Sequence, residues 1–113
     1  MATLLRFRPI MTWHRTDLAA DDIGAGTLRA AVVAGTRVVV VARDGLWYAV
    51  EDRCSHAGCA FSEDGEIDGF HLICNCHGSE FDIRDGQPLQ PPADEPIATF
   101  PVRVATGMIE VES

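Results

Sequence analysis

Lysine is absent from this 113-residue chain, and acidic residues outnumber basic ones. The nine basic residues are all arginine, against 17 acidic residues, so the formal net charge is −8. An acidic surface repels phosphate backbones and anionic lipids, so we expect binding of neither nucleic acid nor a membrane surface. The charge instead suits contact with a basic patch on a partner protein.

Long apolar runs are also missing. The longest candidate, at residues 38–42, has the length of a strand and falls well short of the ~20 residues that span a bilayer. The first residues contain Arg6 and Arg8 but neither the long apolar segment nor the small-residue cleavage site of an export signal, so we expect a cytoplasmic protein. The single asparagine, Asn75, does not begin a glycosylation sequon.

Helical periodicity is weak throughout the chain, whereas short runs of β-branched and aromatic residues recur between turn signals. This pattern predicts an all-β fold, either a small sandwich or a barrel. A single helical turn is expected at residues 16–23, with Thr16 as its cap. The expected strands cover residues 28–33, 37–42, 46–50, 70–74, 97–104 and 108–111.

The length allows one domain, which we expect to fill residues 13–113. Residues 1–12 then form an N-terminal extension, as an edge strand or a tail. Residues 87–96 hold four of the six prolines, and their restricted backbone predicts a stiff surface loop rather than a central strand.

Only four cysteines are present, and they lie in two short segments that each contain a histidine. The first segment, from residue 54, reads Cys-Ser-His-Ala-Gly-Cys, and the second, from residue 74, reads Cys-Asn-Cys-His-Gly-Ser. Each segment offers a thiolate and an imidazole on a loop between expected strands, where side chains can converge on a metal. Taking one cysteine and one histidine of each segment as ligands gives a Cys-x-His limb and a Cys-x-x-His limb with 17 residues between them. These four candidate ligands are Cys54, His56, Cys74 and His77.

Other interpretations of these residues stay open. One is a zinc-bound interaction module, although structural zinc sites usually combine Cys-x₂₋₄-Cys with His-x₃₋₅-His, so mixed limbs fit poorly. Two disulfides would leave both histidines unexplained, and a nucleophilic Cys–His pair would use only two of the residues.

With these two limbs, the chain resembles the Rieske-type [2Fe–2S] proteins. The matching stretch is residues 54–79, with support from Glu51-Asp52-Arg53 before it and from Phe81-Asp82 and Asp85-Gly86 after it. The strand pattern from about residue 13 to residue 111 is similar to that of the small Rieske ferredoxins of multicomponent aromatic-ring dioxygenase systems. The resemblance implies a Rieske-type β-sandwich or barrel with an inserted cluster-binding subdomain at about residues 52–92.

The same resemblance implies one [2Fe–2S] cluster, with Cys54 and Cys74 on one iron and with His56 and His77 on the other. Neutral imidazoles in place of two thiolates make the centre less negative, which places such clusters at ~−150 to +300 mV, against ~−400 mV for plant-type ferredoxins. The histidines are expected at the tip of the molecule, with their outer edges toward solvent as the exit for an electron.

Four neighbouring residues acquire roles through the resemblance. In high-potential relatives, a serine at the position of Ser79 hydrogen-bonds a bridging sulfide, whereas Phe81 replaces a tyrosine that donates to a ligand sulfur. One donor is kept and one is missing, which predicts an intermediate reduction potential. Cys59 and Cys76 stand where respiratory-type Rieske proteins form a disulfide, and we expect the same bridge here, although most dioxygenase ferredoxins lack it.

The implied function is that of a soluble, monomeric one-electron carrier rather than an enzyme. It would accept electrons from an NAD(P)H-dependent flavin reductase and pass them to a terminal Rieske oxygenase acting on aromatic compounds. A Rieske subunit of another redox enzyme, respiratory-like or from a reductase, remains the alternative. Small and apolar residues near the histidines form the expected docking rim: Ala57, Gly58, Gly78, Pro88 and Leu89.

Overall fold

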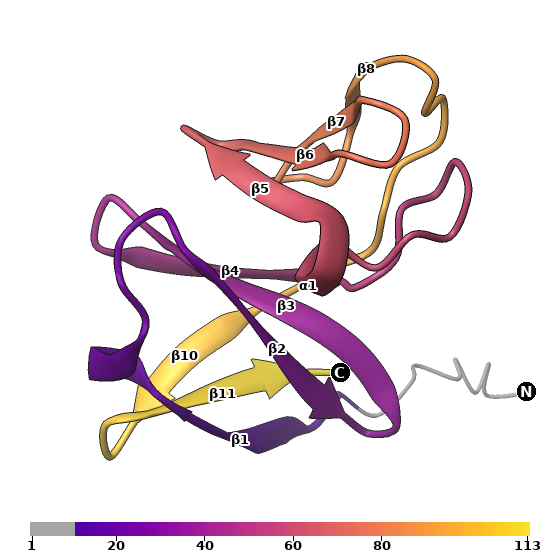
Figure 1. The fold of residues 1–113 in the computed structure, drawn as a ribbon. Coiled ribbons are helices and arrows are strands. Elements are labelled where there is room, and N and C mark those ends of the chain that lie inside the picture. The colour runs from indigo at the N-terminus through magenta and orange to yellow at the C-terminus, as the bar shows by residue number, and fades with distance from the viewer. Residues whose placement is uncertain (1–10) are drawn as a thin grey trace, which may run out of the picture.

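Three antiparallel sheets stack as layers in the computed structural model, which describes residues 11–113 (Figure 1). All but the last two residues of the expected extension at 1–12 therefore lie outside the described residues. No helix within residues 11–113 is long and apolar enough to cross a membrane. The middle sheet has the order β2-β3-β4-β9 and consists of β2 (Leu28–Val33), β3 (Thr36–Arg43), β4 (Leu46–Glu51) and β9 (Thr99–Phe100).

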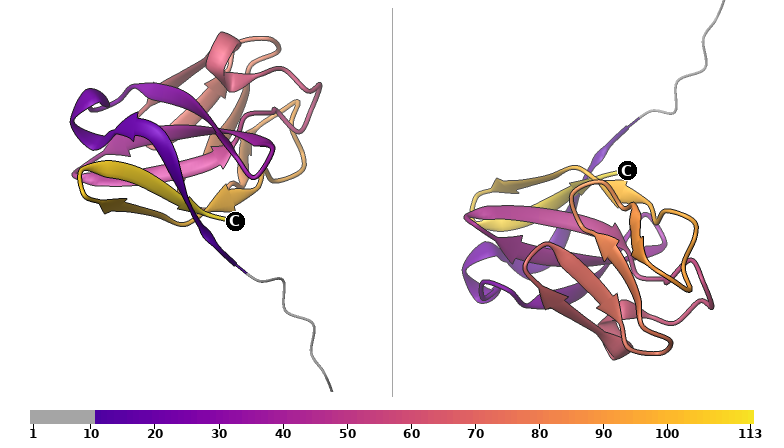
Figure 2. Two further views of the ribbon diagram at one scale, coloured as in Figure 1. Left: turned by 90° about the horizontal axis from the view of Figure 1, so that it is seen from below. Right: turned by 90° about the horizontal axis from the view of Figure 1, so that it is seen from above.

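The other two sheets cover opposite faces of the middle sheet (Figure 2). The three-stranded sheet has the order β1-β11-β10 and consists of β1 (Trp13–Ala19), β10 (Val102–Ala105) and β11 (Met108–Glu112). The four-stranded sheet runs in chain order and consists of β5 (Gly65–Asp68), β6 (His71–Cys74), β7 (Ser79–Asp82) and β8 (Pro88–Gln90). Two single helical turns complete the elements, η1 (Ala20–Asp22) and α1 (Phe61–Asp64).

Four consecutive valines in β3, residues 38–41, explain why the middle sheet has a core on each side. All four are fully buried, and side chains alternate between the faces of a strand. On one face lies the base core, which consists of Ala20, Ile23, Ala31, Val33, Val38, Val40, Ala49, Ile109 and Val111. On the other lies the tip core, which consists of Val39, Val41, Val50, Cys54, Phe61, Leu72, Cys74, Phe81, Ile83, Ala93 and Ile97. An uninterrupted apolar run is what a strand buried on both faces requires.

The all-β prediction is confirmed, and five of the six expected strands correspond to β2, β3, β4, β6 and β11. The single strand expected at 97–104 is wrong. Pro101, which has no amide hydrogen, separates β9 from β10, and these two strands pair in different sheets. Within the proline-rich segment, residues 88–90 form β8, which lies at the edge of its sheet, where a proline is tolerated.

The helical turn expected at 16–23 is also wrong over most of its length. Thr16 lies within β1, where its buried hydroxyl donates to the carbonyl of Ile109 at 2.8 Å. Only residues 20–22 form a short 3₁₀ turn, and its N-cap residue, Ala19, makes no side-chain capping bond. Pairing with β11 at the far end of the chain therefore overrides the local capping signal.

Candidate metal centre

The first Cys/His limb follows β4 and is a loop closed by two backbone hydrogen bonds. The amide of Gly58 donates to the carbonyl of Cys54 at 2.9 Å, and the amide of Cys54 donates to the carbonyl of Cys59 at 2.8 Å. Gly58 has a φ of 75°, a left-handed conformation that glycine adopts without strain. The loop leaves the Cys54 side chain buried and the His56 side chain exposed.

The second limb is the loop between β6 and β7, and it repeats this arrangement. The amide of Gly78 donates to the carbonyl of Cys74 at 2.9 Å, and Gly78 has a φ of 83°. Cys74 is buried at the end of β6, whereas His77 is exposed. Each limb thus presents a buried thiol and an exposed imidazole.

Where the two limbs meet, the thiol of Cys54 lies beside that of Cys74, and the two imidazole rings lie beside each other. The ring centroids of His56 and His77 lie 5.0 Å apart, with the ring planes at 82°. Burial raises the pKa of the Cys74 thiol, and a hydrogen bond with Cys54 raises it further, while the backbone N–H groups of Cys76 and His77 lower it. Those two amides point at the Cys74 sulfur and favour its thiolate, which is the form that binds metal.

Residues 91–98 form a third loop that is tied to both limbs. The amide of Ala93 donates to Ser79 Oγ at 3.1 Å, and the hydroxyl of Ser55 donates to the carbonyl of Glu95 at 2.7 Å. Ser79 is fully buried, and its own hydroxyl proton has no acceptor among residues 11–113. Since buried polar groups are normally satisfied, this proton is available to an acceptor outside the described residues.

Asp52 fastens the first limb to α1. Its buried carboxylate accepts the amide of Ser62 at 2.8 Å, the hydroxyl of Ser62 at 2.5 Å and the Arg37 guanidinium at 3.2 Å. The backbone carbonyl of Asp64, the last residue of α1, then accepts the amide of Asn75, in the second limb, at 2.8 Å. The sequence marked Asp52 only as a flank of the first limb, because its partners come from distant segments.

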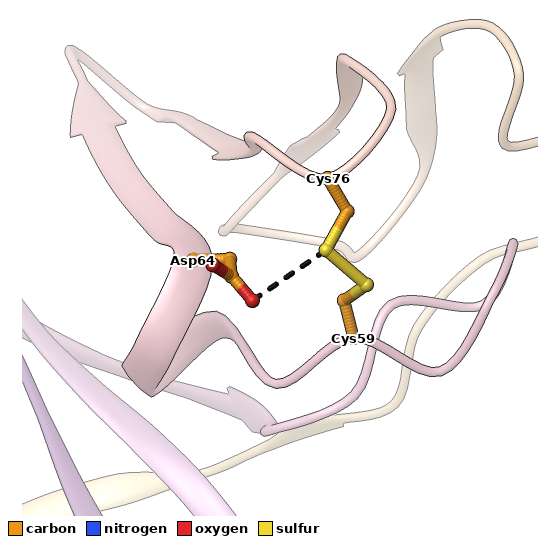
Figure 3. Close-up of a disulfide and its surroundings, with 3 residues drawn as sticks. All are labelled: Cys59, Asp64 and Cys76. Atoms are coloured by element: carbon orange, nitrogen blue, oxygen red, sulfur yellow. Dashed lines mark hydrogen bonds between the residues drawn. A yellow bond between two sulfur atoms is a disulfide. The ribbon is translucent and has the colours of Figure 1, made fainter.

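Cys59 and Cys76 form the expected disulfide, which joins the two limbs (Figure 3). The sulfur atoms of Cys59, Cys74 and Cys76 all lie within 4.8 Å of one another. A disulfide sulfur is not a thiolate ligand, so only Cys74 of these three is available to a metal while the bridge is closed. Cys54 is the second buried free cysteine of the centre.

These features point to one family. The family model of the Rieske [2Fe-2S] domain matches residues 13–101. The chain belongs to the Rieske [2Fe-2S] family. The predicted resemblance is therefore confirmed, and so is its cofactor, one [2Fe–2S] cluster.

Individual Rieske proteins resemble the chain over most of its length. The ferredoxin component of the p-cumate 2,3-dioxygenase system of Pseudomonas putida is 36% identical over 108 residues, which is 91% of this chain and 92% of that protein. Ferredoxin CarAc of Metapseudomonas resinovorans is 36% identical over 82% of this chain and 87% of its own length. The solved ferredoxin of carbazole 1,9a-dioxygenase from Nocardioides aromaticivorans IC177 is 29% identical, with a TM-score of 0.82 over 88% of this chain and 96% of that chain.

One solved structure contains both a ferredoxin and an oxygenase. A chain in the complex of reduced oxygenase and oxidized ferredoxin in carbazole 1,9a-dioxygenase is 34% identical to this chain. Its TM-score is 0.79, over 88% of this chain and 91% of that chain.

The donor set of the Rieske chain fits its cluster. Two buried cysteines lie beside each other, two imidazoles lie beside each other, and the hydroxyl proton of Ser79 is available to an acceptor outside residues 11–113. Phe81 is fully buried and meets Phe61 edge-on at a centroid distance of 5.7 Å, so it contributes packing rather than a hydrogen bond.

The residues of the expected docking rim differ in exposure. Ala57, Gly58 and Gly78 are exposed beside the histidines, and Leu89 is exposed on the edge strand β8, whereas Pro88 on the same strand is half-buried. The guanidinium of Arg53 approaches Gly58, since a Cβ on that glycine would stand 3.4 Å from it. The first limb therefore carries a cation at its surface, which the motif alone did not suggest.

Proposed function

We propose that this Rieske protein is a one-electron carrier between a flavin-dependent ferredoxin reductase, which oxidises NADH or NADPH, and a terminal Rieske oxygenase that acts on aromatic compounds. The pair of exposed imidazoles, His56 and His77, with rings 5.0 Å apart, is the observation that carries the proposal. An electron carrier must bring one side of its metal centre close to a partner while the other side is kept from water. Exposed imidazoles on loops with buried cysteines meet both needs.

The relatives support the same role. Their names describe ferredoxin components of p-cumate and carbazole dioxygenase systems, and one of the similar structures contains a ferredoxin with its oxygenase. The Cys59–Cys76 disulfide is the feature that this chain shares with the respiratory-like alternative, but the similar proteins named above are ferredoxins.

Within this proposal, Cys54 and Cys74 bind one iron and His56 and His77 bind the other. The bound cluster supplies the reversible uptake of a single electron. The tip core shields the side chains of Cys54 and Cys74 from water, and the Ser79 hydroxyl would donate to the bound cluster, which would favour the reduced and more negative state. The small residues Ala57, Gly58 and Gly78, with Pro88 and Leu89, let a partner surface approach the histidines.

The proposal extends to the organisation and location of the chain. Residues 13–113 form the domain, and residues of about 52–92 form its cluster-binding subdomain, since β5 to β8 are inserted between β4 and β9. A carrier that alternates between two docking partners works as a monomer, and a donor that oxidises NADH or NADPH places it in the cytoplasm.

Two measurements on the purified chain test the proposal. Iron and acid-labile sulfide analysis should give about two of each per chain, and the dithionite-reduced protein should show the electron paramagnetic resonance of a mixed-ligand [2Fe–2S] centre. Rapid mixing of the reduced protein with a terminal Rieske oxygenase should reoxidise it. A colourless protein with one zinc would refute the cluster assignment. A cluster that the oxygenase cannot reoxidise would favour a Rieske subunit of another redox enzyme.

A further inference from the structure

Three sulfur atoms and one carboxylate converge where the two limbs meet. The Sγ atoms of Cys59, Cys74 and Cys76 lie within 4.8 Å of one another, and Asp64 Oδ2 lies 3.5 Å from Cys76 Sγ. Figure 3 shows the Asp64 carboxylate, at the end of α1, directed toward the disulfide. While the bridge is closed, Cys76 carries no S–H, so this contact is not a hydrogen bond, and the carboxylate faces the sulfur without a proton between them.

The spacing suits a tetrahedral zinc ion once the bridge opens. With Zn–S near ~2.3 Å and Zn–O near ~2.1 Å, ligand sulfurs stand about 3.8 Å apart and an oxygen stands about 3.6 Å from a sulfur. The Asp64–Cys76 separation already has this value, and the three sulfurs already lie in one group. Opening the bridge frees the sulfurs of Cys59 and Cys76 to move apart toward this spacing.

We propose that reduction of the Cys59–Cys76 disulfide creates a second metal site, in which Cys59, Cys74, Cys76 and Asp64 bind Zn²⁺. Two electrons and two protons from a dithiol convert the bridge into two thiols, and the dithiol itself becomes a disulfide. Zinc then displaces the thiol protons. Cys59 and Cys76 are half-buried and Asp64 is exposed, so a reductant and a metal ion can reach the site from solvent.

Cys74 belongs to both sites, so zinc and the [2Fe–2S] cluster exclude one another. This consequence rests on the proposed cluster ligands. With the bridge closed, the second site keeps one thiolate and one carboxylate, too few to hold zinc against the cluster. The disulfide therefore protects the cluster site against occupation by zinc, in addition to linking the limbs.

The test uses the cluster-loaded protein with and without a trialkylphosphine and with and without zinc sulfate. The phosphine reduces the bridge and becomes its oxide with oxygen from water, and it avoids the strong zinc chelation of a dithiol. After desalting, only the sample given both reagents should contain about one zinc per chain and have lost its iron and its visible colour. Zinc X-ray absorption should show three sulfur neighbours and one oxygen.

The variant Cys59→Ser/Cys76→Ser is the control, because it has neither the bridge nor the additional thiols. It should keep its iron in all four samples. Asp64→Asn, which keeps every cysteine, should need about tenfold more zinc for the same loss of iron, and it serves alone if the double variant does not assemble a cluster.

Absence of zinc in the wild-type protein treated with both reagents would overturn the proposal. So would equal zinc uptake by the double variant, or two sulfur and two nitrogen neighbours around the zinc, since both would place zinc among the cluster ligands. Iron and sulfide analysis of the untreated protein tests the proposed function separately. If that protein has no cluster, zinc binding with and without phosphine still decides whether the second site exists.

Discussion

The two cores on opposite faces of β3 differ in what holds them together. The base core contains only aliphatic side chains, and hydrophobic burial accounts for it. The tip core also contains two phenylalanines and the thiols of Cys54 and Cys74. The same run of valines therefore supports a plain scaffold on one side and a chemical site on the other.

The surrounding strands show the same contrast. Next to the base core, β2 and β3 pair over six residue pairs, whereas each tip strand has four residues or fewer. The tip gains its order from added links: the carboxylate of Asp52, the Cys59–Cys76 bridge, and the third loop at residues 91–98. Burial suffices for the scaffold, while the site depends on a few polar and covalent links, and we expect substitutions in the two regions to have different consequences.

The largest difference is expected between two exposed histidines of the tip, His77 and His71. His77→Ala removes a proposed iron ligand and should abolish nearly all cluster binding. His71→Ala removes only an exposed contact with Glu80, 3.0 Å away, so it should leave the iron content unchanged and change stability by less than about 1 kcal/mol. Iron analysis and the visible spectrum decide this, and full iron in His77→Ala would exclude that residue as a ligand.

Truncation in each core gives the next largest effect. Phe81→Ala, in the tip core, should lower the free energy of unfolding by about 3–5 kcal/mol, and Ile109→Ala, in the base core, by about 2–5 kcal/mol. Only Phe81→Ala should also alter the paramagnetic resonance spectrum, because Phe81 packs on Phe61 at the start of α1. A spectral change of equal size in Ile109→Ala would show that the two cores are not separate.

The base of the fold follows from local sequence signals. The apolar run at residues 38–42 has the length of a strand and lies in β3, and hairpin turns at Asp44-Gly45 and Thr106-Gly107 have residues with positive φ, as such turns require. In the tip, cysteine and histidine spacing indicates the metal site because the chemistry permits few residue types. These parts were predicted because neighbouring residues determine them.

Contacts between distant segments account for what the sequence did not reveal. Trp13 pairs with Glu112 at the other end of the chain, which makes β1 a strand where a helical turn was expected. Likewise, the hydrogen bond from Ser62 of α1 to Asp52, which follows β4, depends on these two segments meeting in space. Neither pairing has a local pattern, so both become visible only in the folded chain.

Two buried hydroxyls, Ser79 in the tip and Thr16 in the base, sharpen the comparison with a smaller effect. Ser79→Ala should lower the midpoint potential, because it removes the proposed donor that stabilises the reduced cluster. Thr16→Val should cost about 1 kcal/mol of stability through its lost bond to Ile109, with the potential unchanged. Spectroelectrochemical titration measures both, and a Ser79→Ala potential equal to the wild type would remove Ser79 from the tuning of the cluster.

The smallest effect concerns two arginines, one in β10 of the base and one in the turn after β7 of the tip, which each contact a carboxylate and an aromatic ring. In the base, Arg103 bonds Glu110 at 2.7 Å and lies 4.3 Å from the centre of the Trp13 ring. In the tip, Arg84 bonds Asp82 at 2.9 and 2.7 Å and lies 4.3 Å from the centre of the Phe70 ring.

The hydrogen bond from Arg84 holds the pKa of Asp82 below its usual range, although burial opposes this. The stabilisation is therefore complete above the unfolded-state pKa of about 4 and is lost as the pH falls through the lower folded-state value. Asp82→Asn should be less stable than the wild type by up to about 1 kcal/mol at pH 7, since Arg84 is largely exposed, and the gap should close on acidification. Thermal unfolding of both proteins from pH 7 to pH 3 measures that gap, and acid sensitivity of the cluster cancels because both carry the same one. A gap that stays constant over this range would show that the ion pair does not contribute to the pH dependence of the tip.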